Sequence, residues 1–314
     1  MDGTLTATSG YQGLRESAAW MDLSARGKIR VSGDDRARLL HAMTTQDVQS
    51  LKPCEGRYAF FLNAQGRVLG DANLFCREDS FLIDTEPETR QKLFDHIDRY
   101  IIADDVTLED LTGQMSTVAI EGPQASAILE RLGAPVPEAD FATRAWDGGM
   151  VARVNSTGAG GFFIFLLPTK RSDLIAALET AGVAEATPDD ARTVRIEHGR
   201  PRYSEEITER YLVQETGQLN AVSFTKGCYL GQEIVERVRS RAQIHRVLRR
   251  IEIDALEPPP AGSKLKSGEA DAGEIASAVF SPALGKVTAL AYVRTSFAEP
   301  RTEIRLGDVR VLVI

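Results

Sequence analysis

Apolar positions change their spacing in a regular way along the first part of the chain. In the stretch IRVSGDDRARLLHAM, residues 29–43, alternating apolar positions are followed by a glycine and then by apolar positions at helical spacing. The stretch VAIEGPQASAILERL, residues 118–132, repeats this order. Each stretch therefore predicts a short strand, a glycine turn and a helix.

A second pair of stretches extends the correspondence. FLIDTEPETRQKLFDHI, residues 81–97, aligns with FFIFLLPTKRSDLIAAL, residues 162–178, and a proline separates strand from helix in both. Residues 27–98 and 116–179 are thus interpreted as two copies of one unit: strand, helix, hairpin-like strands, strand, proline, helix. Any two strand–turn–helix units can align to some extent, but two collinear matches favour a repeat.

The last part of the chain has a different pattern. After about residue 243, short alternating segments such as VLRRIEI, GKVTALAYVR and VRVLVI are separated by Gly, Pro and Asp, and the stretch EPPPAG is a break. This pattern is typical of a small antiparallel barrel or sandwich of about 70 residues. The predicted class is α+β, with a first lobe over 1–112, a second over 113–242 and a β-barrel over 243–314. The sequence leaves open whether the lobes interleave.

Composition narrows the class of protein. The chain has 43% hydrophobic and 26% charged residues, as ordinary globular proteins do. Its net charge of -8 argues against a nucleic-acid partner, because neutralising phosphates takes a basic surface. No apolar run approaches the roughly 20 residues that span a bilayer, and the first residues do not resemble a secretory signal. We expect a cytoplasmic protein with no membrane partner.

The cysteines limit the metal chemistry. Cys54, Cys76 and Cys228 are an odd number without a C-x-x-C pair. They provide neither a disulfide framework nor zinc-ligand spacing, and iron–sulfur clusters normally take four thiolates. We therefore expect no resident metal.

Cys228 lies in FTKGCYLGQEIVER, residues 224–237, just before apolar positions that share one helical face. A helix beginning near Leu230 or Gly231 would place the thiol at its positive end, and Lys226 adds a second positive charge. Both effects favour the thiolate, which is the reactive form. The alternative is a small buried hydrophobic residue, as a lone cysteine often is.

Two carboxylates and a basic stretch are further candidates. Asp71 ends NAQGRVLGD and Glu197 lies in RIEHGRP; each is interpreted either as an acid or ligand group or as a solvated residue. A local basic stretch can receive an anionic ligand or form a solvated face. It consists of Arg237, Arg239, Arg241, His245, Arg246, Arg249 and Arg250.

The stretch KGCYLGQE, residues 226–233, resembles the K-G-C-Y-x-G-Q-E signature of the YgfZ family of folate-binding proteins, which are relatives of the glycine-cleavage T-protein, an aminomethyltransferase. Five other stretches agree with this resemblance in the same order: MDLS, VSGDDRARLLHAMTTQDV, NAQGRVLGD, RIEHGRP and GKVTALAYVR. The resemblance spans nearly the whole chain. It implies two α+β lobes and a β-barrel arranged around a tetrahydrofolate site.

The resemblance also implies roles for single residues. Asp71 corresponds to the T-protein aspartate that lies near the one-carbon nitrogens of folate. Glu197 corresponds to the glutamate expected to hold the pterin, since a carboxylate can accept two hydrogen bonds from its amino group and ring N–H. Arg237 and Tyr229 are implied as further folate contacts, and the basic stretch as a seat for the glutamate tail.

Two hypotheses for the function follow. T-proteins lack a cysteine-centred signature, so Lys226, Cys228 and Tyr229 imply the YgfZ branch, whose members support iron–sulfur enzymes. On the first hypothesis the chain is a tetrahydrofolate-binding accessory protein for the assembly or repair of iron–sulfur enzymes, and Cys228 acts on client proteins or assembly factors as a reactive thiol or transient ligand. On the second it is a folate-dependent aminomethyl or one-carbon transferase in which Asp71 does the chemistry. Whether the chain is an enzyme stays open, and the catalytic candidates are Cys228, Lys226 and Asp71.

Overall fold

The computed structural model describes residues 7–241 and 244–314. The first copy of the predicted repeat contains β2 (Gly27–Ser32), α2 (Arg36–Met43), β3 (Gly56–Leu62), β4 (Val68–Cys76), β5 (Ser80–Thr85) and α3 (Arg90–Asp98). The second contains β7 (Ser116–Glu121), α4 (Ala125–Arg131), β8 (Thr143–Trp146), β9 (Gly149–Ala152), β10 (Gly161–Leu166) and α5 (Pro168–Thr180). The first sheet has the order β3-β4-β5-β2 and the second the order β8-β9-β10-β7, so the repeat is confirmed.

The two copies exchange strands. β1 (Ala19–Asp22) precedes the first copy in the chain but pairs with β7 of the second, and β6 (Thr107–Asp110) precedes the second copy but pairs with β2 of the first. The short β11 (Ala184–Glu185) pairs in parallel with β1. The lobes therefore interleave, and the division into ranges of sequence remains an interpretation.

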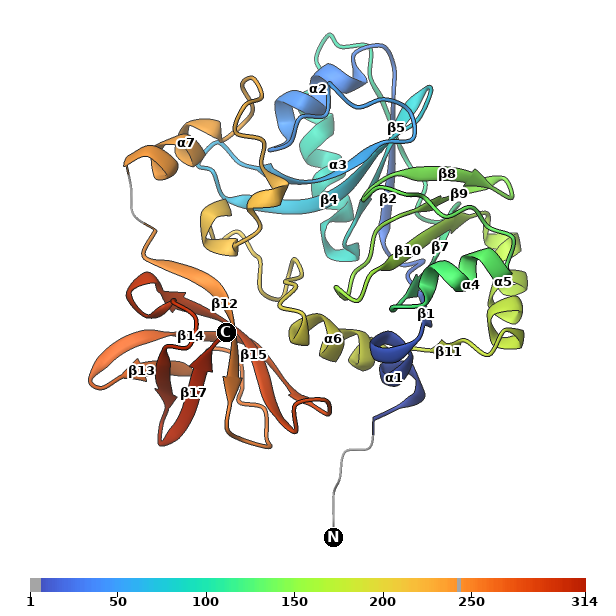
Figure 1. Cartoon of the computed structure of the whole chain (residues 1–314). Coiled ribbons are helices and arrows are strands. Elements are labelled where there is room, and N and C mark those ends of the chain that lie inside the picture. The colour runs from blue at the N-terminus through green and yellow to red at the C-terminus, as the bar shows by residue number, and fades with distance from the viewer. Residues whose placement is uncertain (1–6, 242–243) are drawn as a thin grey trace.

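Each sheet is buried on both faces. Alternate residues of a strand point to opposite faces, and in β10 Phe162 and Ile164 pack against α4 and α5, whereas Phe163 and Phe165 pack in the core between the sheets. Helices α2 and α3 cover the outer face of the first sheet (Figure 1), where Leu40 and other apolar residues are fully buried. This packing explains why the strands have apolar residues on both faces.

A helical segment joins the sheets to the last domain. It contains α6 (Pro188–Glu197), the short turns η2 (Val213–Thr216) and η3 (Leu219–Ala221), and α7 (Gln232–Arg241). α6 packs against α1 (Ser9–Glu16) on one side and against barrel strand β14 on the other. It thereby connects the N-terminal helix, the sheets and the barrel.

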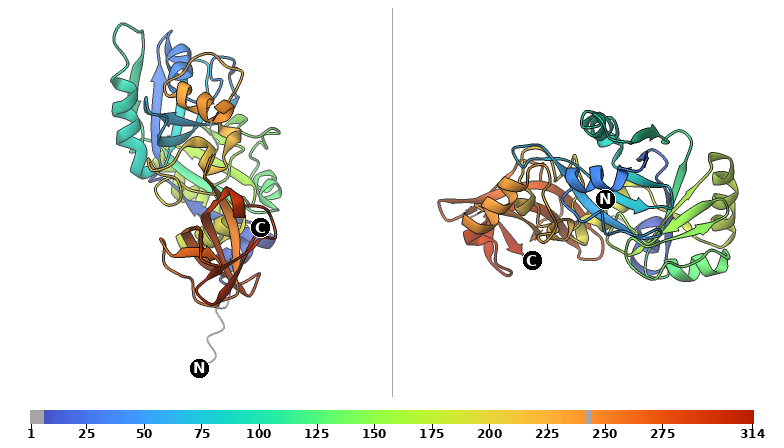
Figure 2. Two further views of the ribbon diagram at one scale, coloured as in Figure 1. Left: turned by 90° about the vertical axis from the view of Figure 1, so that its left-hand side faces the viewer. Right: turned by 90° about the horizontal axis from the view of Figure 1, so that it is seen from above.

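The last domain is a closed barrel, as the alternating pattern predicts (Figures 1 and 2). Its strands are β12 (Arg246–Ile253), β13 (Lys264–Ser267), β14 (Ala270–Ser281), β15 (Lys286–Arg294), β16 (Glu303–Leu306) and β17 (Val309–Val313). All neighbouring strands are antiparallel, in the order β12-β15-β14-β13-β16-β17. Within residues 7–241 and 244–314, no helix has the length and apolar character needed to cross a membrane.

Candidate functional site

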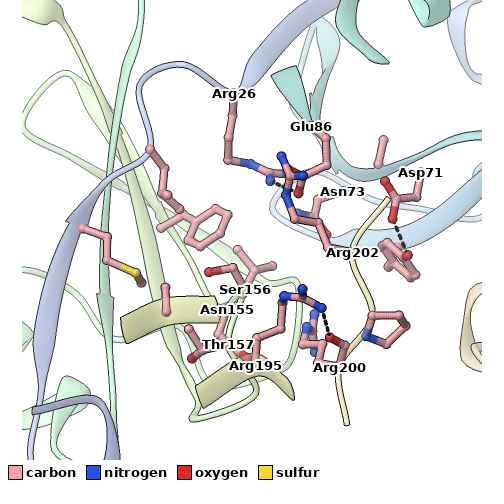
Figure 3. A pocket seen from close by; sticks show the side chains of 18 of the residues that line it. Arg26, Asp71, Asn73, Glu86, Asn155, Ser156, Thr157, Arg195, Arg200 and Arg202 are labelled. Atoms are coloured by element: carbon pink, nitrogen blue, oxygen red, sulfur yellow. Dashed lines mark hydrogen bonds and ion pairs between the residues drawn. The ribbon is translucent and has the colours of Figure 1, made fainter. Parts of the chain in front are cut away.

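A cavity of about 510 Å³ lies where the two sheets, α6 and the loop after α6 meet. This volume is in the range of roughly 300–1,000 Å³ that small-molecule sites occupy. Its wall includes the apolar side chains of Leu23, Phe141 and Phe163 as well as many charged ones. Figure 3 shows Arg26 and Glu86 in one part of the cavity and Arg195 and Arg200 in another.

Asp71 lies on β4 in the wall of this cavity and is 8% exposed. The hydroxyl of Tyr58, on the neighbouring strand, donates to its Oδ2 at 2.7 Å (Figure 3). Burial and then the charge of Glu86 raise the pKa of Asp71 to about 6, although the Tyr58 hydrogen bond opposes the shift. The interpretation of Asp71 as a solvated residue is therefore wrong. A carboxyl with a pKa near the working pH can exchange a proton with a bound molecule.

A frame of ion pairs forms the wall beside Asp71. Arg26 donates to both oxygens of Asp84 at 2.9 Å and also pairs with Glu86. Arg202 reaches Glu86 from the loop after α6, at 2.8 Å. Burial raises the pKa of Glu86, but Arg26 and Arg202 together hold it below its usual value. Asn73 donates to Asp84 through its amide nitrogen, which leaves its amide oxygen as an acceptor in the cavity wall.

The glycine-rich turn between β9 and β10 forms the opposite wall. The two carboxylate oxygens of the buried Glu121 accept from the backbone N–H and the hydroxyl of both Ser156 and Thr157. Gly158 and Gly160 have positive φ angles, of 84° and 79°, which favour glycine. The glycine-rich turn thus joins β9 and β10 as a hairpin, as the predicted hairpin-like strands require. Glu121 fixes this turn against the cavity.

Arg200 lies in the cavity wall and is held there by the end of α6. Gly199 takes a left-handed conformation at φ 68°, so that the Arg200 N–H donates to the Arg195 carbonyl at 2.9 Å. The Arg200 carbonyl accepts from the Arg195 guanidinium at 2.8 Å (Figure 3). The side chain of Arg200 has neither an ion pair nor a hydrogen bond with any residue that the structure describes.

Glu197 lies outside the cavity lining, although it is 7% exposed and the solvated interpretation is wrong for it too. Its Oε1 accepts from Tyr11 at 2.7 Å and from Ser281 at 2.5 Å, and Arg15 is 3.1 Å from Oε2. Its carboxylate thus connects α1, α6 and β14. The structure does not bring Glu197 into the cavity lining with Asp71, and its contact with a pterin stays a prediction.

The signature loop, residues 224–231 just before α7, packs on the turn after α2. The ammonium of Lys226 donates to the carbonyls of His41, Thr44 and Gln46, the last two at 2.7 and 2.9 Å. It also lies 4.8 Å from the ring centroid of Tyr229. Burial lowers the pKa of Lys226 to about 8, and the negative charge of Asp47 opposes this effect. Lys226 is thus a structural clamp between two segments that are distant in sequence.

Cys228 is exposed, and α7 begins after it, at Gln232. The interpretation of this cysteine as a buried hydrophobic residue is therefore wrong. Tyr229, in contrast, is buried in an apolar cluster, and its hydroxyl has no hydrogen-bond partner among the described residues. Arg237 is exposed on α7 and pairs with Glu233 at 2.8 Å, as the spacing predicts. None of these side chains lines the cavity.

Three arginines of the predicted basic stretch have partners within the protein. Arg246 pairs with Glu215 beneath two tyrosine rings, Arg249 donates to a backbone carbonyl, and Arg250 is 3.7 Å from Glu252. No described residue of the stretch lines the cavity. These arginines hold the barrel together and hold it against the helical segment.

Two family models of known proteins match this chain. The family of the GCVT N-terminal domain matches residues 6–226, and that of the glycine cleavage T-protein C-terminal barrel domain matches residues 246–311. An aminomethyltransferase of Rubrobacter xylanophilus is 30% identical over 310 residues, which cover 96% of this chain and 81% of the relative. A putative chloroplastic transferase of Arabidopsis thaliana is 29% identical over 250 residues, or 76% of this chain and 57% of the relative.

A solved structure shows the same fold. The glycine cleavage system aminomethyltransferase T from Bartonella henselae superposes with a TM-score of 0.88. The superposition covers 99% of this chain and 88% of that one, at 22% sequence identity. The predicted fold class, with two α+β lobes and a C-terminal barrel, is confirmed.

Proposed function

This chain belongs to the glycine cleavage T-protein family, and from that premise we propose that it binds tetrahydrofolate, or a one-carbon derivative of it, in the cavity beside Asp71. The single observation that carries the proposal is the buried, partly unbonded carboxyl of Asp71 in the wall of a cavity of about 510 Å³. The resemblance implies that the one-carbon nitrogens of folate lie near this residue, which supports the proposal.

The groups lining the cavity suit a pterin. Phe141 and Phe163 offer apolar contact for a flat ring, and a pterin presents an amino group and a ring N–H as donors. Asp71 Oδ1 and the Asn73 amide oxygen are acceptors that the hydrogen bonds of Tyr58 and Asp84 leave available. Arg200 supplies a cation that has no ion-pair partner among the described residues. Such a site combines an apolar body with a few polar groups, as small-molecule sites do.

We propose aminomethyl or one-carbon transfer as the reaction. Tetrahydrofolate supplies the nitrogens that accept the one-carbon unit. Asp71, with a pKa of about 6, holds or releases a proton beside those nitrogens, and the Tyr58 hydroxyl fixes the orientation of its carboxyl. The names of the curated relatives support this reaction over an accessory role, because the relative with 30% identity is an aminomethyltransferase.

Titration of the pure protein with tetrahydrofolate under anaerobic conditions tests the binding. Wild type should bind, and Asp71→Asn should bind at least tenfold more weakly, since a charged hydrogen bond contributes about 1.5–3 kcal/mol. Asp140→Asn is the matched control, because Asp140 lies at the same cavity but its side chain is 89% exposed. Equal affinity of wild type and Asp71→Asn would remove Asp71 from the site.

The reaction needs a separate assay. Formation of methylene-tetrahydrofolate from an aminomethyl donor should occur with wild type and fall at least 100-fold in Asp71→Asn, in the range that general acid–base groups contribute. Binding of tetrahydrofolate without any turnover of such donors would contradict the transferase function and leave the binding intact.

Exposure of Cys228 favours a second candidate function. Its thiol is presented outside the cavity, on a loop that Lys226 clamps to the turn after α2. Together with the resemblance to the YgfZ signature, this supports an accessory role towards iron–sulfur client proteins or assembly factors. A strain lacking this protein should lose iron–sulfur enzyme activity and regain it with wild type but not with Cys228→Ala. Full rescue by Cys228→Ala would rule this function out, and Cys54→Ala is the matched exposed-cysteine control.

A further inference from the structure

The arginines of the cavity wall fall into two classes. Five of them, Arg26, Arg153, Arg192, Arg195 and Arg202, have carboxylate oxygens within 4 Å. Arg200 alone among the described arginines of the wall has no such partner. Among the described arginines of the wall, Arg200 is therefore the one whose charge no carboxylate within 4 Å balances.

Arg200 is fixed at this place by its backbone. Gly199 at φ 68° ends α6, and both the N–H and the C=O of Arg200 bond to Arg195. Arg195 is itself held by both oxygens of Glu206, at 2.8 and 3.0 Å. The backbone of Arg200 is therefore fixed, and only its side chain can change conformation when a ligand binds. Arg200, Tyr58 and Asp71 line the same cavity, and the positive charge of Arg200 opposes the rise of the Tyr58 pKa that burial and Asp71 cause.

A guanidinium in a partly enclosed cavity is matched best by an anion that accepts two hydrogen bonds, and a carboxylate has this geometry. Tetrahydrofolate carries its negative charge only in the carboxylates of its glutamate tail, whereas its pterin is neutral. We infer that Arg200 binds a carboxylate of this tail and thereby makes the cavity select pteroylglutamates over pteroates. The inference rests on the proposed folate-binding function.

Other cations are poorer receivers for the tail. The residues of the basic stretch lie outside the cavity lining wherever the structure describes them, and the remaining cavity arginines already pair with carboxylates. A tail bound to one of those would have to displace an existing ion pair. At Arg200 no ion pair with a described residue has to be broken.

Calorimetric titration with two ligands tests the inference. Tetrahydrofolate and tetrahydropteroate share the pterin and the benzoyl ring, but only the first has the glutamate. Wild type should bind tetrahydrofolate at least tenfold more tightly than tetrahydropteroate. Arg200→Gln should lower the affinity for tetrahydrofolate about 30-fold and leave that for tetrahydropteroate within twofold, so the preference disappears. Arg200→Lys keeps the charge but loses the planar guanidinium, so it should keep part of the preference for tetrahydrofolate that Arg200→Gln loses.

Arg153→Gln is the matched control, because Arg153 also lines the cavity but donates to the Pro137 carbonyl and lies over the Phe162 ring. It should keep the wild-type preference. Thermal unfolding should show that Arg200→Gln folds normally, since the side chain has no ion pair or hydrogen bond with a described residue to lose. An unchanged preference in Arg200→Gln overturns the inference while folate binding stands, and so does an equal loss for both ligands. If wild type binds neither ligand, the proposed folate-binding function fails as well.

Discussion

The cavity and the signature loop each combine a cation with a group capable of chemistry, but they treat the cation differently. In the loop, Lys226 donates to three backbone carbonyls and leaves no charge for a ligand, whereas Cys228 beside it is exposed. In the cavity, Asp71 is enclosed and Arg200 has no partner among the described residues. A basic residue inside a specific motif can therefore be structural, and an unpartnered one outside it can be the better candidate for binding.

Removal of the Lys226 ammonium should have the largest effect. Lys226→Met leaves the carbonyls of His41, Thr44 and Gln46 without their donor at the end of α2, and each such loss costs about 1–3 kcal/mol. We expect the free energy of unfolding in urea to fall by about 4 kcal/mol. Lys266→Met, on an exposed position of the barrel, is the control and should change it by less than about 0.5 kcal/mol. A similar small effect at Lys226 would mean that the loop is not clamped.

Removal of the Asp71 charge in the cavity should raise the free energy of unfolding, whereas removal of the Lys226 charge lowers it. Because burial raises the pKa of Asp71 from 3.8 to about 6, the folded protein binds more protons than the unfolded one between these values. Wild type therefore loses stability through Asp71 as the pH rises from 4 to 6, and the cost stays constant above that window. Asp71→Asn should be more stable than wild type by about 3 kcal/mol at pH 8 and equal to it below pH 4. Urea unfolding at both pH values measures this, and a difference that does not depend on pH would contradict the shifted pKa.

Much of the architecture could be predicted from the sequence, because alternating and helical spacing are local properties. The exchange of β1 and β6 between the sheets could not, since alternation predicts a strand but not its partner. Glu197 lies two positions after Arg195 on α6, so the two side chains point about 200° apart, and of the two only Arg195 lines the cavity. The contact of Glu197 with a pterin stays a prediction.

Arg200 was missed for a similar reason. In RIEHGRP the glycine before it and the proline after it mark a helix end, and the residue between them is presented where α6 stops. That signal was available in the sequence. Whether the arginine has a carboxylate partner depends on residues far away in the chain, and only the structure shows this.

Glu197 is as buried as Asp71 but lies outside the cavity lining. Glu197→Gln keeps an acceptor for Tyr11 and Ser281 but loses the charge that faces Arg15 at 3.1 Å. We expect a loss of about 1 kcal/mol in stability, because Arg15 is partly exposed, and an affinity for tetrahydrofolate within twofold of wild type. A large loss of affinity with normal stability would return Glu197 to the site.

Cys228→Ser should have the smallest effect on the fold and on the cavity. The side chain is exposed, so the unfolding free energy should change by less than about 0.5 kcal/mol, and tetrahydrofolate affinity should not change. The thiol count should change instead. Cys54 and Cys228 are exposed and Cys76 is buried, so an aromatic disulfide reagent should titrate two thiols rapidly in folded wild type and one in Cys228→Ser. Cys76 should react only after unfolding, because burial also raises the pKa of its thiol. If tetrahydrofolate slows the reaction of Cys228, the loop and the cavity communicate, and the two regions cannot be treated as separate sites.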